Sequence, residues 1–185
     1  MRLAASVWSC TLVFILLSTG VTDTAWADDP EPGVEYTSGK VLRDKVSGIS
    51  FVVPGGWVGT LPMGETAFRL HAKRRLGEIY VVTDQVSLAE ARHRIENPEI
   101  PGSDLALSPQ NKMKEKNHVF EASYTVAGSK LQAQTLSMWR EGTLVSITSI
   151  CPPDNCRRFK KARTSIQKSL NFIQKSRSSE PVAVK

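Results

Sequence analysis

Hydrophobic and polar residues alternate along much of this 185-residue chain in the manner of β-strands. The apolar, β-branched run 49–53 ends at the turn-forming residues 54–56, and this order is typical of a strand and its stop. Within 65–72 the apolar residues occupy alternate positions, with Arg69 and His71 between them. Side chains alternate between the two faces of a strand, so we expect Arg69 and His71 on the face opposite the apolar residues.

Further strands are predicted in the second half of the chain. The continuous apolar run 79–83 is typical of a strand at the centre of a sheet. Segments 117–126, 130–139 and 143–150 alternate again, and Gly128 and Gly142 fall in the turns between them. This spacing predicts a meander of antiparallel hairpins.

Two segments have helical periodicity instead. Ser87 begins a capping-box pattern, which predicts a helix that ends at Pro98. A second helix is expected from an Asp154 N-cap to about Ile173. At about 100° per residue its apolar side chains form one stripe about 80° wide. These residues are Phe159, Ala162, Ile166, Leu170 and Ile173. The sequence therefore predicts an α+β domain, an antiparallel β-sheet flanked by helices.

Residues 1–27 have the order of a secretory signal peptide. A positive start with Arg2 precedes the uncharged stretch 3–21, and small residues then frame a cleavage site after Ala27. The uncharged stretch also reaches the length that spans a bilayer, so an uncleaved anchor is the alternative. Either form places the folded part outside the cytoplasm, and cleavage predicts a periplasmic or secreted protein.

Composition divides the rest of the chain. Residues 28–44 begin with an acidic, proline-rich stretch and are predicted to be a flexible leader, whereas 175–185 are polar and predicted to be a loose C-terminal tail. We expect a single domain over 45–174. A chain of this size buries enough surface to hold a core without a metal.

The cysteines support the same compartment. Signal cleavage removes Cys10 and leaves Cys151 and Cys156, and such a pair normally forms a disulfide in an oxidising medium. Their spacing matches neither thioredoxin-like redox pairs nor the usual zinc knuckles. A structural disulfide is the prediction; a redox pair and a metal site with His118 are the alternatives.

The segment 48–57 and the order of elements resemble the PsbP-like family, the extrinsic photosystem subunits and their bacterial relatives. Residues 48–57 look like the family's opening strand, proline and tryptophan, and 165–172 resemble its final segment. The nuclear-import factor that binds the Ran GTPase is similar in fold. The resemblance implies an α/β/α sandwich and a non-enzymatic accessory or binding role, and it supplies no ligand residues.

No catalytic residue, cofactor or metal site is assigned from the sequence. Nothing in the sequence matches a nucleophile elbow, a Walker loop, a dinucleotide fingerprint or a His-Glu-X-X-His helix. His71, His93 and His118 fall in different predicted elements, and Trp57 and Trp139 are expected to pack in or beside the core. A small periplasmic hydrolase remains a third hypothesis, because catalytic triads assemble in space.

The formal net charge of +6 is the remaining functional signal, and cleavage leaves it unchanged because Arg2 and Asp23 are both removed. Cations gather before Gly77 and on the second predicted helix. The candidate anion-binding residues are Arg69, Lys73, Arg74, Arg75, Arg157, Arg158, Lys160 and Lys161. If both clusters face one side, they form a patch suited to an anionic lipid, a polysaccharide or an acidic partner. A solvated helix face plus a charged hairpin tip is the alternative.

These observations predict an exported, non-enzymatic accessory or binding protein of the bacterial cell envelope. Its expected partner is an unknown envelope protein or an anionic envelope component, with peripheral membrane contact included. Nucleic acid is a poor candidate outside the cytoplasm. Binding of an anionic surface, lipid or polysaccharide, through the basic patch is the more specific alternative.

Overall fold

The computed structural model describes residues 29–72 and 77–172. The strands of its large sheet are β1 (Glu35–Thr37), β4 (Trp57–Thr60), β5 (Phe68–Ala72), β6 (Glu78–Gln85), β7 (Leu107–Pro109), β8 (Lys114–Lys116), β9 (Val119–Val126), β10 (Gln132–Arg140) and β11 (Thr143–Cys151). They pair antiparallel in the order β1-β4-β5-β6-β11-β10-β9-β7, and β8 also pairs with β9. A small antiparallel sheet joins β12 (Asn171–Phe172), β3 (Ile49–Val52) and β2 (Val41–Asp44).

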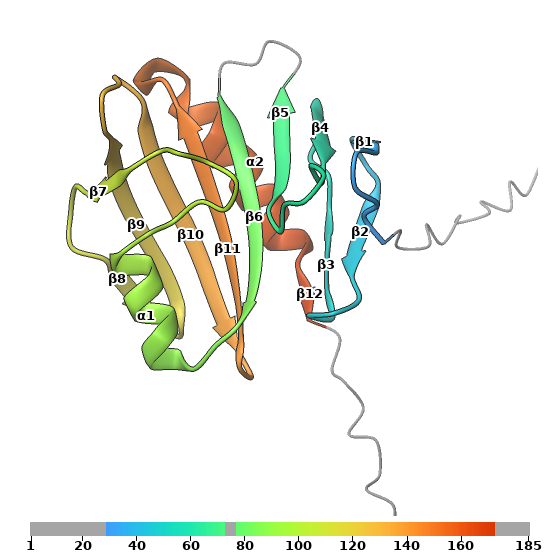
Figure 1. Ribbon diagram of the computed structural model, residues 1–185, viewed down its shortest axis with the longest axis horizontal. Coiled ribbons are helices and arrows are strands. Elements are labelled where there is room, and N and C mark those ends of the chain that lie inside the picture. Colours follow the sequence, from blue (N-terminus) through green and yellow to red (C-terminus); the bar gives the residue numbers. More distant parts are fainter. Residues whose placement is uncertain (1–28, 73–76, 173–185) are drawn as a thin grey trace, which may run out of the picture.

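Helices cover both faces of the large sheet. Helix α2 (Cys156–Ser169) lies behind the sheet in the view of Figure 1, and α1 (Leu88–Glu96) lies in front of it. The predicted α+β class, with an antiparallel sheet between helices, is thus confirmed. Within the described ranges, neither helix has the length and apolar character that crossing a membrane requires.

The central hairpin follows its sequence pattern closely. Strands β10 and β11 pair over their whole length, from Arg140 opposite Thr143 to Gln132 opposite Cys151. The two residues between them, Glu141 and Gly142, have φ angles of 50° and 83°, as a type I′ turn requires. This pairing sets which side chains of β9 and β10 face α2.

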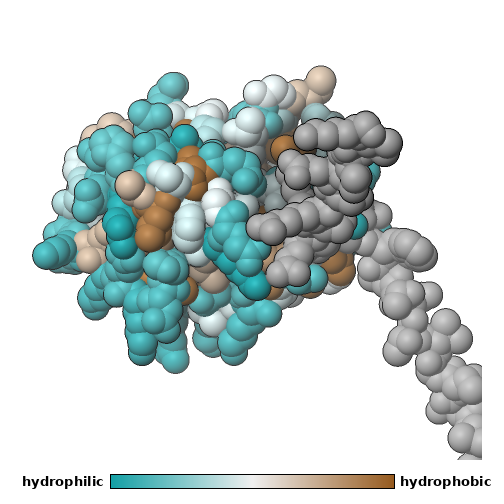
Figure 2. All heavy atoms as spheres, turned by 90° about the horizontal axis from the view of Figure 1, so that it is seen from below, coloured by the Kyte–Doolittle hydropathy of each residue, from teal (hydrophilic) through white to brown (hydrophobic). Residues whose placement is uncertain are grey.

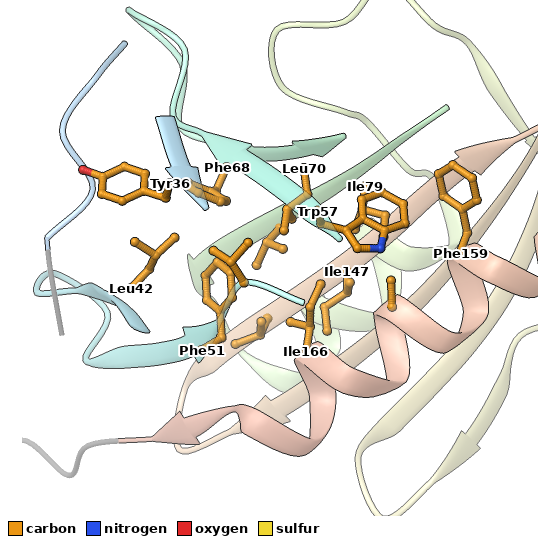
Figure 3. Close-up of a cluster of buried hydrophobic side chains, with 14 of the residues drawn as sticks. Tyr36, Leu42, Phe51, Trp57, Phe68, Leu70, Ile79, Ile147, Phe159 and Ile166 are labelled. Carbon is orange, nitrogen blue, oxygen red and sulfur yellow. The ribbon is translucent and has the colours of Figure 1, made fainter. Parts of the chain in front are cut away.

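The main core lies between α2 and the sheet. Phe159, Ala162 and Ile166 from the predicted stripe are buried in it. The rings of Trp57 and Phe159 meet edge to face at 5.0 Å, and Ile166 extends from α2 toward Ile147 (Figure 3). By contrast, the end of the molecule that carries α1 and the β10–β11 turn is mostly hydrophilic (Figure 2).

The leader predicted over 28–44 is wrong in its second half, because β1 and β2 lie there. Tyr36 is 7% exposed and Leu42 is fully buried, and both belong to the main core. The folded domain therefore begins well before residue 45. The signal peptide predicted over 1–27 and the tail predicted over 175–185 lie outside the described residues.

The second helix is shorter than predicted at both ends. A 3-10 turn, η1 (Pro153–Asn155), contains Asp154, so α2 begins at Cys156 rather than at an Asp154 cap. At the other end Leu170 has ψ of 127°, which is extended backbone. The chain then forms β12 against β3, so the side chains of Leu170 and Phe172 reach the core from an extended segment.

The predicted disulfide is present between Cys151 and Cys156, whose Cα atoms are 5.6 Å apart. It joins the last residue of β11 to the first residue of α2 and so fixes where the helix leaves the sheet. With both sulfurs bonded, neither is free to act as a metal ligand. The ring of His118, the histidine named in that alternative, meets the ring of Trp139 edge to face at 5.5 Å.

Candidate functional site

A groove of about 600 Å³ lies between α2 and the face of the sheet formed by β9 and β10. Helix α2 packs on β11 and β3 and leaves this outer part of the face uncovered. The residues that line the groove are mostly polar or charged. From the described residues these are Asn111, Lys112, Lys114, Glu121, Ala122, Ser123, Gln134, Thr135, Leu136, Lys160, Arg163, Thr164 and Gln167.

The helical repeat explains which α2 side chains reach the groove. Relative to Phe159, about 100° per residue places Arg163 about 40° around the helix, at the border of the apolar stripe. Lys160 and Thr164 follow at about 100° and 140° on the same side. One flank of α2 therefore carries a buried cation, an exposed cation and a hydroxyl into the same space.

The opposite wall comes from a broken edge strand. Pro109 ends β7, and only the N–H of Gln110 continues the ladder, donating to the Ser123 carbonyl at 2.8 Å. Residues 111–113 leave the sheet before β8 resumes with Lys114 opposite Glu121. This interruption places Lys112 and Lys114 on the rim of the groove.

Arg163 is the most unusual side chain of the site. It is only 8% exposed, and its Nη2 donates to Oε1 of Gln134 at 2.7 Å. Its Nε is buried and has no partner among the described residues. Burial lowers the pKa of this guanidinium to about 10, partly offset by the Glu121 carboxylate, so Arg163 still carries its charge at neutral pH.

A second set of cations continues from the groove onto the exposed side of α2. Arg157, Lys160, Lys161 and Lys168 line one shallow depression there, and all four are exposed. We call these four residues the basic α2 face. None of them takes part in an ion pair within the described ranges. The groove and the basic α2 face share Lys160, so the two adjoin along one flank of α2.

The structure unites only part of the predicted patch. Arg157, Lys160 and Lys161 lie together, whereas Arg158 turns to the other flank of α2, with its guanidinium 5.9 Å from the Trp57 ring centroid. Lys73, Arg74 and Arg75 lie outside the described residues.

Arg69 is on the opposite face of the sheet. Its neighbours Phe68 and Leu70 pack toward α2, so strand alternation directs Arg69 away from the helix. There its Nε donates to Oε2 of Glu65 at 2.9 Å and its Nη2 to the Gly102 carbonyl at 2.7 Å. Arg69 therefore tethers a loop, and it is not part of the basic surface at α2.

A second pocket, of about 430 Å³, lies on the α1 side of the sheet. Two of its polar groups are already paired: Asp84 pairs with Arg94 at 2.9 Å, and the Tyr124 hydroxyl donates to the Ile95 carbonyl at 2.5 Å. In the described part of the chain, no three His, Cys, Asp or Glu side chains are grouped to hold a metal ion. The groove beside α2 is therefore the stronger candidate, because its central cation has an unpartnered N–H.

Comparisons with known proteins bear on the fold. The sequence matches no protein-family model and no curated protein. Cyanobacterial PsbP (CyanoP) from Synechocystis sp. PCC 6803 aligns with a TM-score of 0.52 and 14% identity, over 77% of this chain and 97% of that one. The fold is PsbP-like.

Two other solved structures align with the PsbP-like domain less closely. Mog1p, a Ran-binding protein of Saccharomyces cerevisiae, gives a TM-score of 0.49 and 10% identity over 75% of this chain and 97% of its own. A protein from Bacteroides thetaiotaomicron gives 0.46 and 9% over 75% of this chain and 50% of its own.

Arg163, Lys112 and Lys114 were not among the residues predicted from sequence. Arg163 stands four residues after Phe159 and three before Ile166, which is the spacing of the buried stripe. That spacing is the signal that could have identified a buried cation. The two lysines had no such signal, because their position depends on where the edge strand breaks.

Proposed function

We propose that this PsbP-like protein is a non-enzymatic binding protein of the bacterial cell envelope that docks on an anionic lipid surface through the basic α2 face. One observation carries the proposal: four exposed cations share one side of α2 and have no ion-pair partner among the described residues. Such a surface attracts anions. In the unbound protein its like charges repel one another more than the charges of a mixed surface would.

The location rests on two further features. Residues 1–27 have the pattern of an export signal. The Cys151–Cys156 disulfide is compatible with an oxidising compartment outside the cytoplasm. For an exported protein with a positive face, anionic lipid headgroups are an abundant surface of opposite charge.

The expected strength follows from the charges. A Lys or Arg near an anionic membrane contributes about 1 kcal/mol, so the basic α2 face supplies about 4 kcal/mol before the costs of association. The exposed large hydrophobic residues of the described chain, Val34, Val46, Met63 and Leu105, all lie outside α2. Attraction through this face is therefore electrostatic and must weaken as salt screens it.

Vesicle co-sedimentation across a salt series tests the proposal. Protein secreted through its own N-terminal segment should bind phosphatidylglycerol-containing vesicles at low salt, bind them progressively less as NaCl rises, and ignore phosphatidylcholine vesicles. Absent binding, or binding that does not change with salt, would contradict it. Binding to an acidic polysaccharide but to neither vesicle would reject the lipid surface as the partner.

A matched pair of double variants separates this face from net charge. Lys161→Gln with Lys168→Gln removes two charges from the basic α2 face, whereas Lys45→Gln with Lys130→Gln removes two exposed charges elsewhere. The first pair should weaken vesicle binding about tenfold or more, given about 1 kcal/mol for each charge. The second should change it much less, and equal losses would mean that α2 is not the docking face.

A further inference from the structure

We infer that the groove beside α2 is a binding site for the phosphate group of a phosphate ester, with Arg163 as its central donor. The source of that phosphate, a lipid headgroup, rests on the proposed function. The lipid headgroup and a soluble phosphate ester share this chemistry. The basic α2 face provides general attraction, whereas the groove provides a defined place for one anionic group.

The state of the Arg163 side chain is the first reason. A guanidinium has five N–H donors in a planar fork, which matches the oxygens of phosphate. In the described structure one hydrogen bond is made, from Nη2 to Gln134, while Nε is buried without a partner. A buried charge is normally paired, so a side chain in this condition lacks an acceptor that an anion would supply.

The surrounding groups are the second reason. Lys160 lies one helical turn before Arg163, and Lys112 and Lys114 come from the opposite wall. Ser123 and Thr164 add hydroxyl donors. With Arg163, four cations line the groove against one carboxylate, that of Glu121.

The size of the groove indicates an ester rather than a free ion. Ligand sites of small molecules generally occupy about 300–1,000 Å³, and this groove has about 600 Å³. Inorganic phosphate fills a small part of that volume. The remaining space, next to Leu136, suits the organic group that the phosphate carries.

Calorimetric titration of the secreted protein with glycerol 3-phosphate and with inorganic phosphate tests the site. We expect saturable binding of both, with the ester tighter. Arg163→Met should weaken ester binding by about tenfold or more, as expected for the loss of hydrogen bonds from a charged donor. Lys168→Gln, which removes a charge of the same helix outside the groove, should change it less than about twofold.

Two exposed positions in the groove keep the test independent of folding. Lys114→Gln should weaken ester binding about two- to fivefold, and Glu121→Gln should tighten it by a similar factor because a repulsive charge is removed. Tightening by Glu121→Gln is the distinguishing result, since damage to the fold does not improve binding.

The outcomes separate the two proposals. If neither phosphate probe binds and Arg163→Met leaves vesicle binding unchanged, the phosphate site is wrong, although docking through the basic α2 face survives. A much larger loss of vesicle binding in Arg163→Met than in Lys168→Gln would identify the headgroup as the source. Ester binding that depends on Arg163, without any vesicle binding, would keep the site and reject the lipid surface. Equal effects of Arg163→Met and Lys168→Gln on ester binding would overturn the site.

Discussion

Replacing Arg163 by methionine should weaken phosphate-ester binding without destabilising the protein. Arg163 is 8% exposed and makes one described hydrogen bond, to Gln134. Methionine is also unbranched, although shorter, and has a similar helix propensity, so the backbone of α2 has no reason to change. The stability of the variant relative to the parent depends on whether burial of the charge costs more free energy than the hydrogen bond contributes.

The magnitudes of these two effects are comparable. Burial lowers the pKa of Arg163 to about 10, and a depression of that size corresponds to about 3 kcal/mol of desolvation cost. A hydrogen bond from a charged donor contributes about 1.5–3 kcal/mol. Methionine also places apolar atoms beside Ile166 and Phe159. We expect Arg163→Met to have a free energy of unfolding between that of the parent and about 2 kcal/mol above it.

Urea unfolding at neutral pH, where Arg163 is charged in both states, measures this difference directly. Added glycerol 3-phosphate should then raise the midpoint of the parent protein more than that of Arg163→Met, because a native state that binds the ester more tightly gains more stability from it. A variant clearly less stable than the parent would refute the reasoning. Arg163 would then be a structural residue whose hydrogen bond outweighs its desolvation.

Two further predictions concern stability. Burial raises the pKa of Tyr124 to about 12, so this tyrosine ionises in the unfolded chain first, and the free energy of unfolding should fall as pH rises from about 10 to 12. Tyr124→Phe should flatten this alkaline decline when urea unfolding is measured as a function of pH. An unchanged slope would assign the decline to other groups. Replacing Cys151 and Cys156 together by alanine should lower the free energy of unfolding by about 2 kcal/mol, the chain-closure value for so short a loop. Calorimetry of both forms checks this, and an undiminished melting temperature would show that the bond does not contribute to stability.

The sequence predicted those elements whose pattern repeats several times. Strands β9, β10 and β11 alternate over eight or nine residues each, and Ser87 caps α1 as expected, accepting from the N–H of Glu90 at 3.2 Å. Strands β1 and β2 were missed because each is short and buries a single side chain, Tyr36 or Leu42. One buried residue between exposed ones produces no periodicity.

The candidate site was predicted less well, for two physical reasons. No charged residue of α2 was predicted to be buried, although Arg163 has the spacing of the buried stripe. The sequence also left open whether the two basic clusters face the same side. The alternation of β5 already excluded this for Arg69, because a strand that packs Phe68 and Leu70 against α2 must turn Arg69 to the other face.

Amide hydrogen exchange with and without phosphatidylglycerol vesicles tests the central claim most directly. Bound protein should show added protection in α2 (Cys156–Ser169) and in the groove wall around β8 (Lys114–Lys116), and this protection should disappear at high salt. Exchange in α1 (Leu88–Glu96), on the opposite face of the sheet, should not change. Protection confined to the α1 face, or absent from α2, would contradict docking through the basic surface.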